Sequence, residues 1–234
     1  MNNSSPTRSI LLWDIPTRLF HWSLVLLMIG AFITANQAMM ERHALIGQAI
    51  LSLIIYRILW GFVGGETTRF RHFVKGPKTL IAYLVDLRKA LGKEGEKPHS
   101  VGHNPAGGLM ILLLLLAVLV QAVLGLFSNE DTFLYFDAPL VHLVGSSISN
   151  QLTAIHKSLP IVLLILVATH VGAALSYLLL FGDNLIWPMI TGQKKFPEQL
   201  VAQGDPKAGS IRLALLCLGM AILLVQGSIW ILSP

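Results

Sequence analysis

Five runs of apolar residues constrain this chain more than any other feature of its sequence. A helix needs about 20 consecutive apolar residues to span the roughly 30 Å hydrocarbon layer of a bilayer. Hydrocarbon offers no hydrogen-bond partners, and the runs lack the alternation of apolar and polar residues that marks a strand, so helices are required. We therefore predict an all-α membrane protein. The predicted spans are Phe20–Gln37, Ala44–Val63, Ala106–Phe127, Leu159–Phe181 and Ile211–Leu232.

The composition agrees with a membrane protein. Hydrophobic residues make up 54% of the 234 residues and charged residues only 12%, whereas soluble domains carry about 25% charged residues. The single cysteine, Cys217, excludes disulfides, thiolate-rich metal sites and a Cys-x-x-Cys-His haem attachment within this sequence. We interpret Cys217 as a small packing residue in the last apolar run.

The connections between the runs differ in charge. Residues 64–104 contain eight Lys and Arg side chains, and a second basic cluster follows the fourth run. Residues 128–155 contain no Lys or Arg and three acidic side chains. Because cytoplasmic connections are enriched in Lys and Arg, we predict a cytoplasmic N-terminus and a C-terminus on the opposite side. Residues 76–91 have helical periodicity and are predicted to form a helix along the headgroups.

Eight histidines occur in the chain. Three of them lie in the first basic connection and are interpreted as solvated or headgroup-facing: His72, His99 and His103. His142, in the acidic connection, is ambiguous. The other four lie in or at the ends of apolar runs, where polar side chains are costly and usually mark a site. These four are His21, His43, His156 and His170.

The direction of each helix pairs these four histidines by depth. His156 and His170 are close to four helical turns apart, so they lie on one face of a helix, separated by about 21 Å. The predicted topology then puts His21 and His170 near the cytoplasmic side, and His43 and His156 near the outer side. Imidazoles that face each other at two depths favour two haem groups with bis-histidine ligation.

Two other interpretations of the four histidines remain open. Another metal is possible in principle, but zinc requires further ligands, and the sequence places no Cys, Asp or Glu at either depth. The histidines could also brace neighbouring helices through hydrogen bonds alone.

Several residues near the histidines support a haem interpretation. Gly47 is four residues after His43 on the same face, where a small side chain would let a flat macrocycle approach. Arg18, three residues before His21, and Arg57, near the inner end of the second run, are suited to neutralise haem propionates. Both arginines are equally compatible with anchoring at the cytoplasmic surface. Pro160 removes the helical hydrogen bond to the carbonyl of His156 and is predicted to kink the helix.

Four sequence features resemble the bacterial cytochrome b-561 group, over about residues 11–197. They are WDIPTRLFHW, HNPAGGLM, the spacing of His156 and His170, and DNLIWPMITGQKKF. This group is related to the cytochrome b subunits of nickel–iron hydrogenases and formate dehydrogenases. The resemblance implies a four-helix bundle that binds two haem b groups through the four membrane histidines, in the bacterial inner membrane. Residues 11–197 would form this di-haem domain, and residues 198–234 a linker and an additional fifth transmembrane helix.

The resemblance also implies a quinone site and a redox function. In the related dehydrogenase subunits a quinone binds near the start of the third helix, where Asn104 stands in this chain. We expect an electron-transfer protein that connects the quinone pool to a periplasmic redox partner, and together with that partner it would act as a quinone oxidoreductase. A c-type cytochrome is the favoured partner, because the acidic outer connection would attract a basic surface. The direction of electron flow is open.

Three alternative functions are retained. The chain could be the cytochrome b subunit of a hydrogenase or dehydrogenase complex, although Lys157 replaces a second histidine that hydrogenase-type subunits tend to have beside the ligand. It could oxidise superoxide and reduce quinone. It could be a non-redox membrane scaffold. Membrane lipid is an expected contact in each case, and no nucleic-acid partner is expected.

Overall fold

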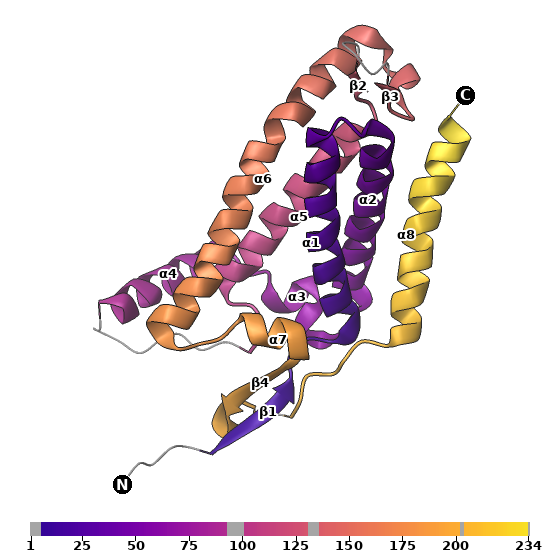
Figure 1. The fold of residues 1–234 in the computed structure, drawn as a ribbon. Helices are drawn as coiled ribbons and strands as arrows, with labels where there is room; N and C mark the ends of the chain where they lie inside the picture. Colours follow the sequence, from indigo (N-terminus) through magenta and orange to yellow (C-terminus); the bar gives the residue numbers. More distant parts are fainter. Residues whose placement is uncertain (1–5, 93–100, 131–135, 202–203, 234) are drawn as a thin grey trace. The chain divides into compact units, whose positions relative to one another are not determined.

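A computed structural model describes residues 6–92, 101–130, 136–201 and 204–233 of the chain (Figure 1). Lys93, Lys97, His99 and Asp131 lie outside the described residues. Within the described ranges, five helices are long and apolar enough to cross a membrane, which confirms the predicted fold class. They are α1 (Ile15–Asn36), α2 (Met40–Val63), α5 (Pro105–Gly125), α6 (Gly145–Phe181) and α8 (Ile211–Leu232).

Side-chain caps explain where two of these helices begin. Asp14 precedes α1, and its Oδ1 accepts a hydrogen bond of 3.0 Å from the backbone N–H of Thr17. Asn104 precedes α5, and its Oδ1 accepts one of 2.7 Å from the N–H of Gly107. Each cap satisfies a backbone donor in the first turn, which has no partner within the helix.

The helix α6 begins at Gly145, well before the predicted start at Leu159. Its polar first turns are held by hydrogen bonds to the end of α5 and the connection that follows. Ser149 Oγ donates to the carbonyl of Phe127 at 2.8 Å, and Thr153 Oγ1 donates to Asn129 Oδ1 at 3.0 Å. The apolar run alone could not reveal this extension, because it depends on these tertiary contacts.

Shorter elements occupy the connections. Pro77–Leu91 forms α4, with Pro77 at the first position, as the periodicity of residues 76–91 predicted. The remaining helices are α3 (Phe70–Phe73), α7 (Ile186–Thr191) and the 3-10 turns η1 (Glu66–Thr68), η2 (Val141–Leu143) and η3 (Glu198–Val201). Asn129–Glu130 (β2) pairs with Phe136–Asp137 (β3).

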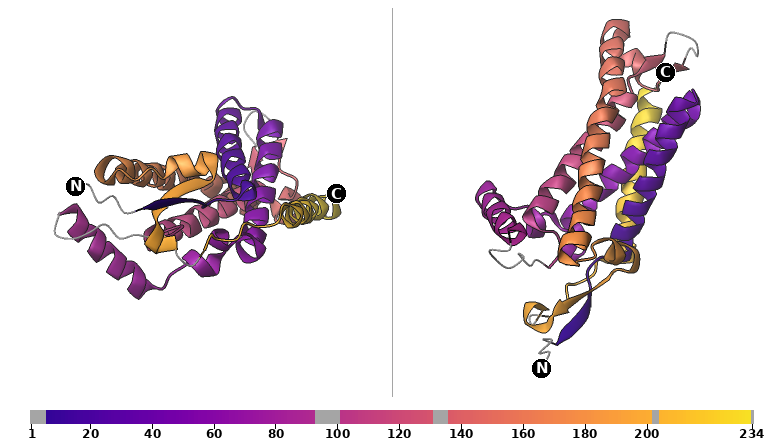
Figure 2. Two further views of the ribbon diagram at one scale, coloured as in Figure 1. Left: turned by 90° about the horizontal axis from the view of Figure 1, so that it is seen from below. Right: turned by 60° about the vertical axis from the view of Figure 1, so that its left-hand side comes forward.

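A two-stranded sheet joins the N-terminal segment to the connection after α6. Thr7–Leu11 (β1) pairs antiparallel with Gln193–Pro197 (β4) (Figure 2). In this register Thr7 is opposite Pro197. The sequence pattern did not predict this strand. The strand is stabilised by a partner far away in the sequence, together with a small apolar cluster. This cluster contains Ile10, Leu12, Trp13, Phe196 and Val201.

The chain divides into two compact units. The first comprises residues 1–18, 59–112 and 168–214, and the second comprises residues 19–58, 113–167 and 215–234. The boundary falls inside each of the five long helices. The first unit contains the β1–β4 sheet, α3, α4 and α7, and the second contains the β2–β3 pair.

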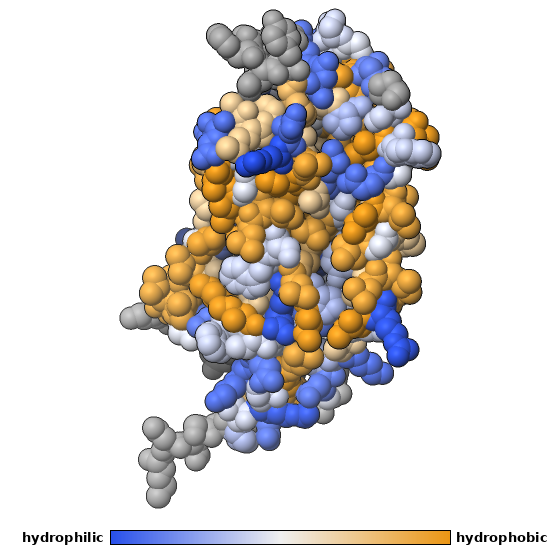
Figure 3. Space-filling view, turned by 45° about the vertical axis from the view of Figure 1, so that its right-hand side comes forward, coloured by the Kyte–Doolittle hydropathy of each residue, from blue (hydrophilic) through white to orange (hydrophobic). Residues whose placement is uncertain are grey.

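Apolar side chains cover the exposed surfaces of the long helices, as in the face drawn in Figure 3. On α8, Leu223 is 74% exposed, whereas Cys217, Ala221 and Val225 are buried at a spacing of four residues. This separation of exposed and buried side chains is typical of a helix that packs against protein on one side and faces lipid on the other. The burial of Cys217 agrees with its predicted role as a packing residue.

Candidate functional site

His43 on α2 and His156 on α6 are neighbours in the second unit. Their ring centroids are 6.1 Å apart, and the ring planes make an angle of 77°. Two imidazoles that bind one metal ion from opposite sides, each at a nitrogen–metal distance of about 2 Å, have their rings roughly 6 Å apart. The spacing of this pair is therefore compatible with two axial ligands of one metal ion.

Both rings form a hydrogen bond through Nδ1 with a backbone carbonyl of a neighbouring helix. His43 Nδ1 lies 2.9 Å from the carbonyl oxygen of Ala31 on α1, and His156 Nδ1 lies 3.0 Å from that of Gln121 on α5. A carbonyl oxygen can only accept, so Nδ1 carries a proton, and in the neutral imidazole Nε2 is then the atom with the lone pair. Metal-binding histidines are commonly oriented in this way, with the second nitrogen donating to a carbonyl.

The turn between α1 and α2 brings His43 to its acceptor. Ala38 adopts a left-handed conformation with φ of 54°, and the N–H of Met39 donates to the carbonyl of Thr34 at 2.9 Å. The chain therefore reverses within a few residues. His43, in the first turns of α2, can then reach back to Ala31 in the last turns of α1.

Gln121 holds His156 in a second way, which the sequence analysis did not predict. Pro160 has no N–H, so the carbonyl of His156 lacks the donor that a helix normally provides four residues later. The side-chain Nε2 of Gln121 donates to this carbonyl at 3.0 Å. The same nitrogen is 3.5 Å from His156 Nε2, at the outer limit for a hydrogen bond. Pro160 therefore creates an acceptor that Gln121 satisfies.

Glycines leave space around this histidine pair. A Cβ atom at Gly125, on α5, would lie 3.1 Å from Cε1 of His156, so a larger residue at this position would push the ring by a few tenths of an ångström. A Cβ atom at Gly47 would meet nothing within 4 Å, which is compatible with the predicted approach of a macrocycle. A side chain would be tolerated more easily at Gly30, because a Cβ atom there would lie 3.4 Å from the flexible end of Ile46.

The donor set of this site fits haem iron. A haem supplies the four equatorial nitrogens itself and needs only axial ligands from the protein. Two imidazoles that keep Nδ1 on a carbonyl present Nε2 as the ligating atom and meet that requirement. At His156 a metal ion would displace only the long contact of 3.5 Å with Gln121 Nε2. A tetrahedral zinc site needs at least three protein ligands, and no group of three or more His, Cys, Asp or Glu side chains is close enough to hold a metal ion within the described residues.

The other predicted pair is divided between the units. His21 lies on α1 in the second unit, with its ring centroid 5.0 Å from that of Trp22. His170 lies on α6 in the first unit. Both side chains are half-buried. Their shared ligation of an inner haem stays a prediction.

The two predicted propionate-binding arginines have different surroundings. Arg18, in the first unit, is half-buried, and its Nη1 donates to the carbonyl of Ile190 near the end of α7 at 2.5 Å. A Cβ atom at Gly192 would lie 3.2 Å from Arg18 Nε. Arg57, in the second unit, is only 3% exposed. A buried guanidinium requires compensating charge or hydrogen bonds.

Asn104 joins the cap of α5 to two tyrosines. While its Oδ1 caps the helix, its Nδ2 donates to the hydroxyl of Tyr177 on α6 at 3.2 Å. The hydroxyls of Tyr177 and Tyr83 are in turn hydrogen-bonded to each other. The Asn104 amide therefore acts as both a hydrogen-bond acceptor and a donor within this cluster. Neither tyrosine could be predicted as its partner from the sequence pattern.

Tyr83 is buried on α4, next to a pocket. Burial, reinforced by the hydrogen bond and electrostatic interaction with Tyr177, raises the pKa of the Tyr83 phenol above its ordinary value. The phenol therefore remains neutral at physiological pH. The pocket has a volume of about 440 Å³, and its lining includes Tyr83, His103, Pro105, His72 and Lys75.

His103 is the exception among the histidines that we interpreted as solvated or headgroup-facing. Its ring packs against Trp13 and Phe73, with centroid distances of 4.4 and 5.0 Å. That interpretation is wrong for His103, because the segment before α5 turns toward these aromatic rings. His72 is exposed, as expected, and its Nε2 accepts a hydrogen bond of 3.2 Å from Arg71 Nε.

Comparison with known proteins identifies one family. A family model described as prokaryotic cytochrome b561 matches residues 12–192, which include four of the five long helices and end before α8. The searches of curated proteins and of solved structures gave no match.

Proposed function

The chain belongs to the prokaryotic cytochrome b561 family, and we propose that it carries electrons between the quinone pool and a periplasmic redox partner. Family membership makes it a multi-pass bacterial membrane protein that binds haem b and takes part in electron transfer. We further propose that it binds two haem groups, exchanges electrons with quinone and with a periplasmic partner, and lies in the inner membrane.

The outer haem would be held by His43 and His156. The observation that carries this assignment is the shared orientation of the two rings, each with Nδ1 on a backbone carbonyl. When bound, the haem supplies a reversible one-electron couple. With both histidines bound to it, the iron would have no open position for oxygen or substrate, which favours electron transfer over ligand chemistry.

The inner haem would be held by His21 and His170, near the cytoplasmic side. The spacing of His156 and His170 along one continuous helix supports two separate sites. Arg18 and Arg57 would neutralise the propionates. We assign this di-haem domain to residues 11–197, and the linker and fifth helix to residues 198–234.

The quinone would bind near Asn104. The support is the cluster of neutral hydrogen-bonding groups formed by Asn104, Tyr177 and Tyr83, beside a pocket large enough for a quinone ring. We expect Asn104→Asp to keep the cap of α5 but to lose the donor to Tyr177. It should therefore slow quinone-dependent haem oxidation several-fold while haem content stays unchanged.

The periplasmic partner would approach the outer connection. Residues 128–155 contain acidic side chains and no Lys or Arg, and Asp137 is exposed. This charge favours a partner with a basic surface, such as a c-type cytochrome, through electrostatic steering. A hydrogenase or dehydrogenase subunit and superoxide remain the alternative electron donors, and a scaffold without redox function is the least favoured proposal.

Haem content tests the central proposal directly. The pyridine haemochrome assay on purified protein should give two haem b groups per chain. His43→Ala and His156→Ala should each remove one haem, and so should His21→Ala and His170→Ala. Combining His43→Ala with His156→Ala should still leave one haem, whereas combining His43→Ala with His170→Ala should leave none. One haem per chain in the wild type would contradict the di-haem proposal.

A further inference from the structure

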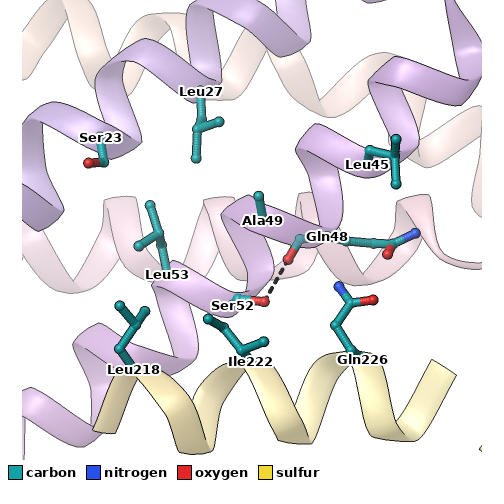
Figure 4. A pocket seen from close by; sticks show the side chains of 10 residues that line it. All are labelled: Ser23, Leu27, Leu45, Gln48, Ala49, Ser52, Leu53, Leu218, Ile222 and Gln226. Atoms are coloured by element: carbon teal, nitrogen blue, oxygen red, sulfur yellow. Dashed lines mark hydrogen bonds between the residues drawn. The ribbon is translucent and has the colours of Figure 1, made fainter. Parts of the chain in front are cut away.

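A pocket of about 510 Å³ opens between α1, α2 and α8, entirely within the second unit (Figure 4). Its walls are mainly aliphatic and include Leu27 from α1, Leu53 from α2 and Ile222 from α8. The family match ends at residue 192, so the α8 wall belongs to a helix outside the matched range. The pocket therefore depends on the part of the chain whose role the family does not explain.

Two glutamine amides give this pocket its polar character. Gln48 projects from α2, and Gln226 projects from α8 toward it (Figure 4). Neither amide group is hydrogen-bonded to another group of the residues that the structure describes. Each lies within a membrane-spanning helix, where an uncharged polar side chain is costly and usually serves a site.

The remaining polar lining is also neutral. Ser52 Oγ donates to the backbone carbonyl of Gln48 at 2.9 Å, so it is already satisfied within the helix, and Ser23 adds one hydroxyl. The ten lining side chains include no Lys, Arg, His, Asp or Glu. Such a lining disfavours phosphate and carboxylate headgroups, which need cationic partners. It favours a neutral ligand with oxygen acceptors and an apolar body.

The pocket is distinct from the histidine pair. Gln48 is five residues after His43, which places the two side chains about 140° apart around α2 at 3.6 residues per turn. The pocket therefore lies on the far side of α2 from His43. A helix with its side chains is about 10 Å wide, so a ligand in the pocket would be separated from the histidine site by only this one helix.

We propose that this pocket binds the ring of a membrane quinone, with Gln48 and Gln226 donating to its carbonyl oxygens. The aliphatic walls would contact the first part of the isoprenoid chain. This would be a second quinone site, formed by α8, in addition to the one near Asn104. It rests on the proposed exchange of electrons with the quinone pool.

A photoreactive azido-ubiquinone with a short isoprenoid tail tests the site in the purified full-length protein. Peptide mapping should find cross-links on α2 and α8. Ile222→Trp fills the pocket and should abolish them. Leu223→Trp makes the same change at the next residue, which is exposed and not part of the lining, and should leave them intact. Gln48→Leu combined with Gln226→Leu should weaken labelling by about tenfold or more, because two hydrogen bonds are lost.

The outcomes separate this site from the proposed function. Excess ubiquinone-1 should compete with the label, and diacylglycerol should not; competition by diacylglycerol alone would overturn the assignment to quinone. Cross-links confined to the region around Asn104 would overturn the α8 site but leave the proposed quinone exchange intact. No cross-links anywhere, together with no quinone-dependent haem oxidation, would overturn both. Haem content, measured on every variant, verifies that the fold is retained.

Discussion

Two of the hydrogen bonds between His156 and Gln121 run in opposite directions between α6 and α5. His156 Nδ1 donates to the backbone carbonyl of Gln121, and Gln121 Nε2 donates to the backbone carbonyl of His156, each at 3.0 Å. The first bond orients the ring, and the second satisfies the acceptor that Pro160 leaves without a helical donor. One glutamine thus supports both the side chain and the backbone of a proposed haem ligand.

This relationship predicts a rescue. Gln121→Leu should lower the free energy of unfolding by about 1–3 kcal/mol, because a buried carbonyl loses its partner. Pro160→Ala restores an N–H that can donate to the same carbonyl, so Gln121→Leu should cost much less in the Pro160→Ala background. Haem loss during heating, followed by the Soret absorbance, measures both effects. Additive effects of the two substitutions would contradict the shared acceptor.

Gly125→Ala should disturb the outer haem site without unfolding the helix. The new methyl group would lie 3.1 Å from the ring of His156, so the ring must shift, while alanine itself favours the helix by about 1 kcal/mol. We expect weaker binding of one haem and an altered low-spin signal in electron paramagnetic resonance. Gly219→Ala on α8 is the matched control, because a Cβ atom there meets nothing within 4 Å. Unchanged haem binding in Gly125→Ala would exclude the steric argument.

Asp14 is predicted to anchor the segment that leads into α8. Its carboxylate is 5% exposed, caps α1 through Oδ1, and accepts a hydrogen bond of 3.2 Å from the N–H of Gly209 through Oδ2. Asp14→Asn keeps one acceptor oxygen and should cost about 1 kcal/mol. Asp14→Ala also loses the cap and should cost up to about 2 kcal/mol more. Thermal unfolding followed by circular dichroism would measure the difference, and equal losses in the two variants would argue against two separate contacts.

Tyr83 should make the free energy of unfolding decrease as the pH becomes alkaline. The pKa of the phenol is raised in the folded protein by burial and by Tyr177, so above the ordinary value of about 10 the unfolded chain releases a proton that the folded chain retains. The stabilisation contributed by Tyr83 is therefore complete below about pH 10 and is lost as the pH rises further. The stability difference between wild type and Tyr83→Phe should shrink between about pH 9 and pH 11. A stability difference between the two proteins that stays constant over that range would contradict the raised pKa of Tyr83.

The membrane-spanning helices could be predicted from the sequence, because a span in lipid must satisfy its backbone within itself. The apolar run at Ile211–Leu232 coincides with α8. The start of α6 was missed, because its first turns are polar and depend on contacts with residues around Phe127. The strand Thr7–Leu11 was missed for a similar reason, since its partner lies more than 180 residues away.

The sequence by itself determined that four histidines lie in or at the ends of apolar helices, and from this it predicts the haem ligands. Histidines in apolar helices are rare because their desolvation is costly, and their spacing along a helix follows from its pitch. The tertiary structure decided what orients His43 and His156: the carbonyls of Ala31 and Gln121 accept the ring protons, and Gly125 leaves room for the ring of His156. It also decided that α8 closes a neutral pocket with α1 and α2. These features depend on which helices are neighbours, and hydrophobic runs alone do not specify that, because every apolar helix satisfies lipid equally well.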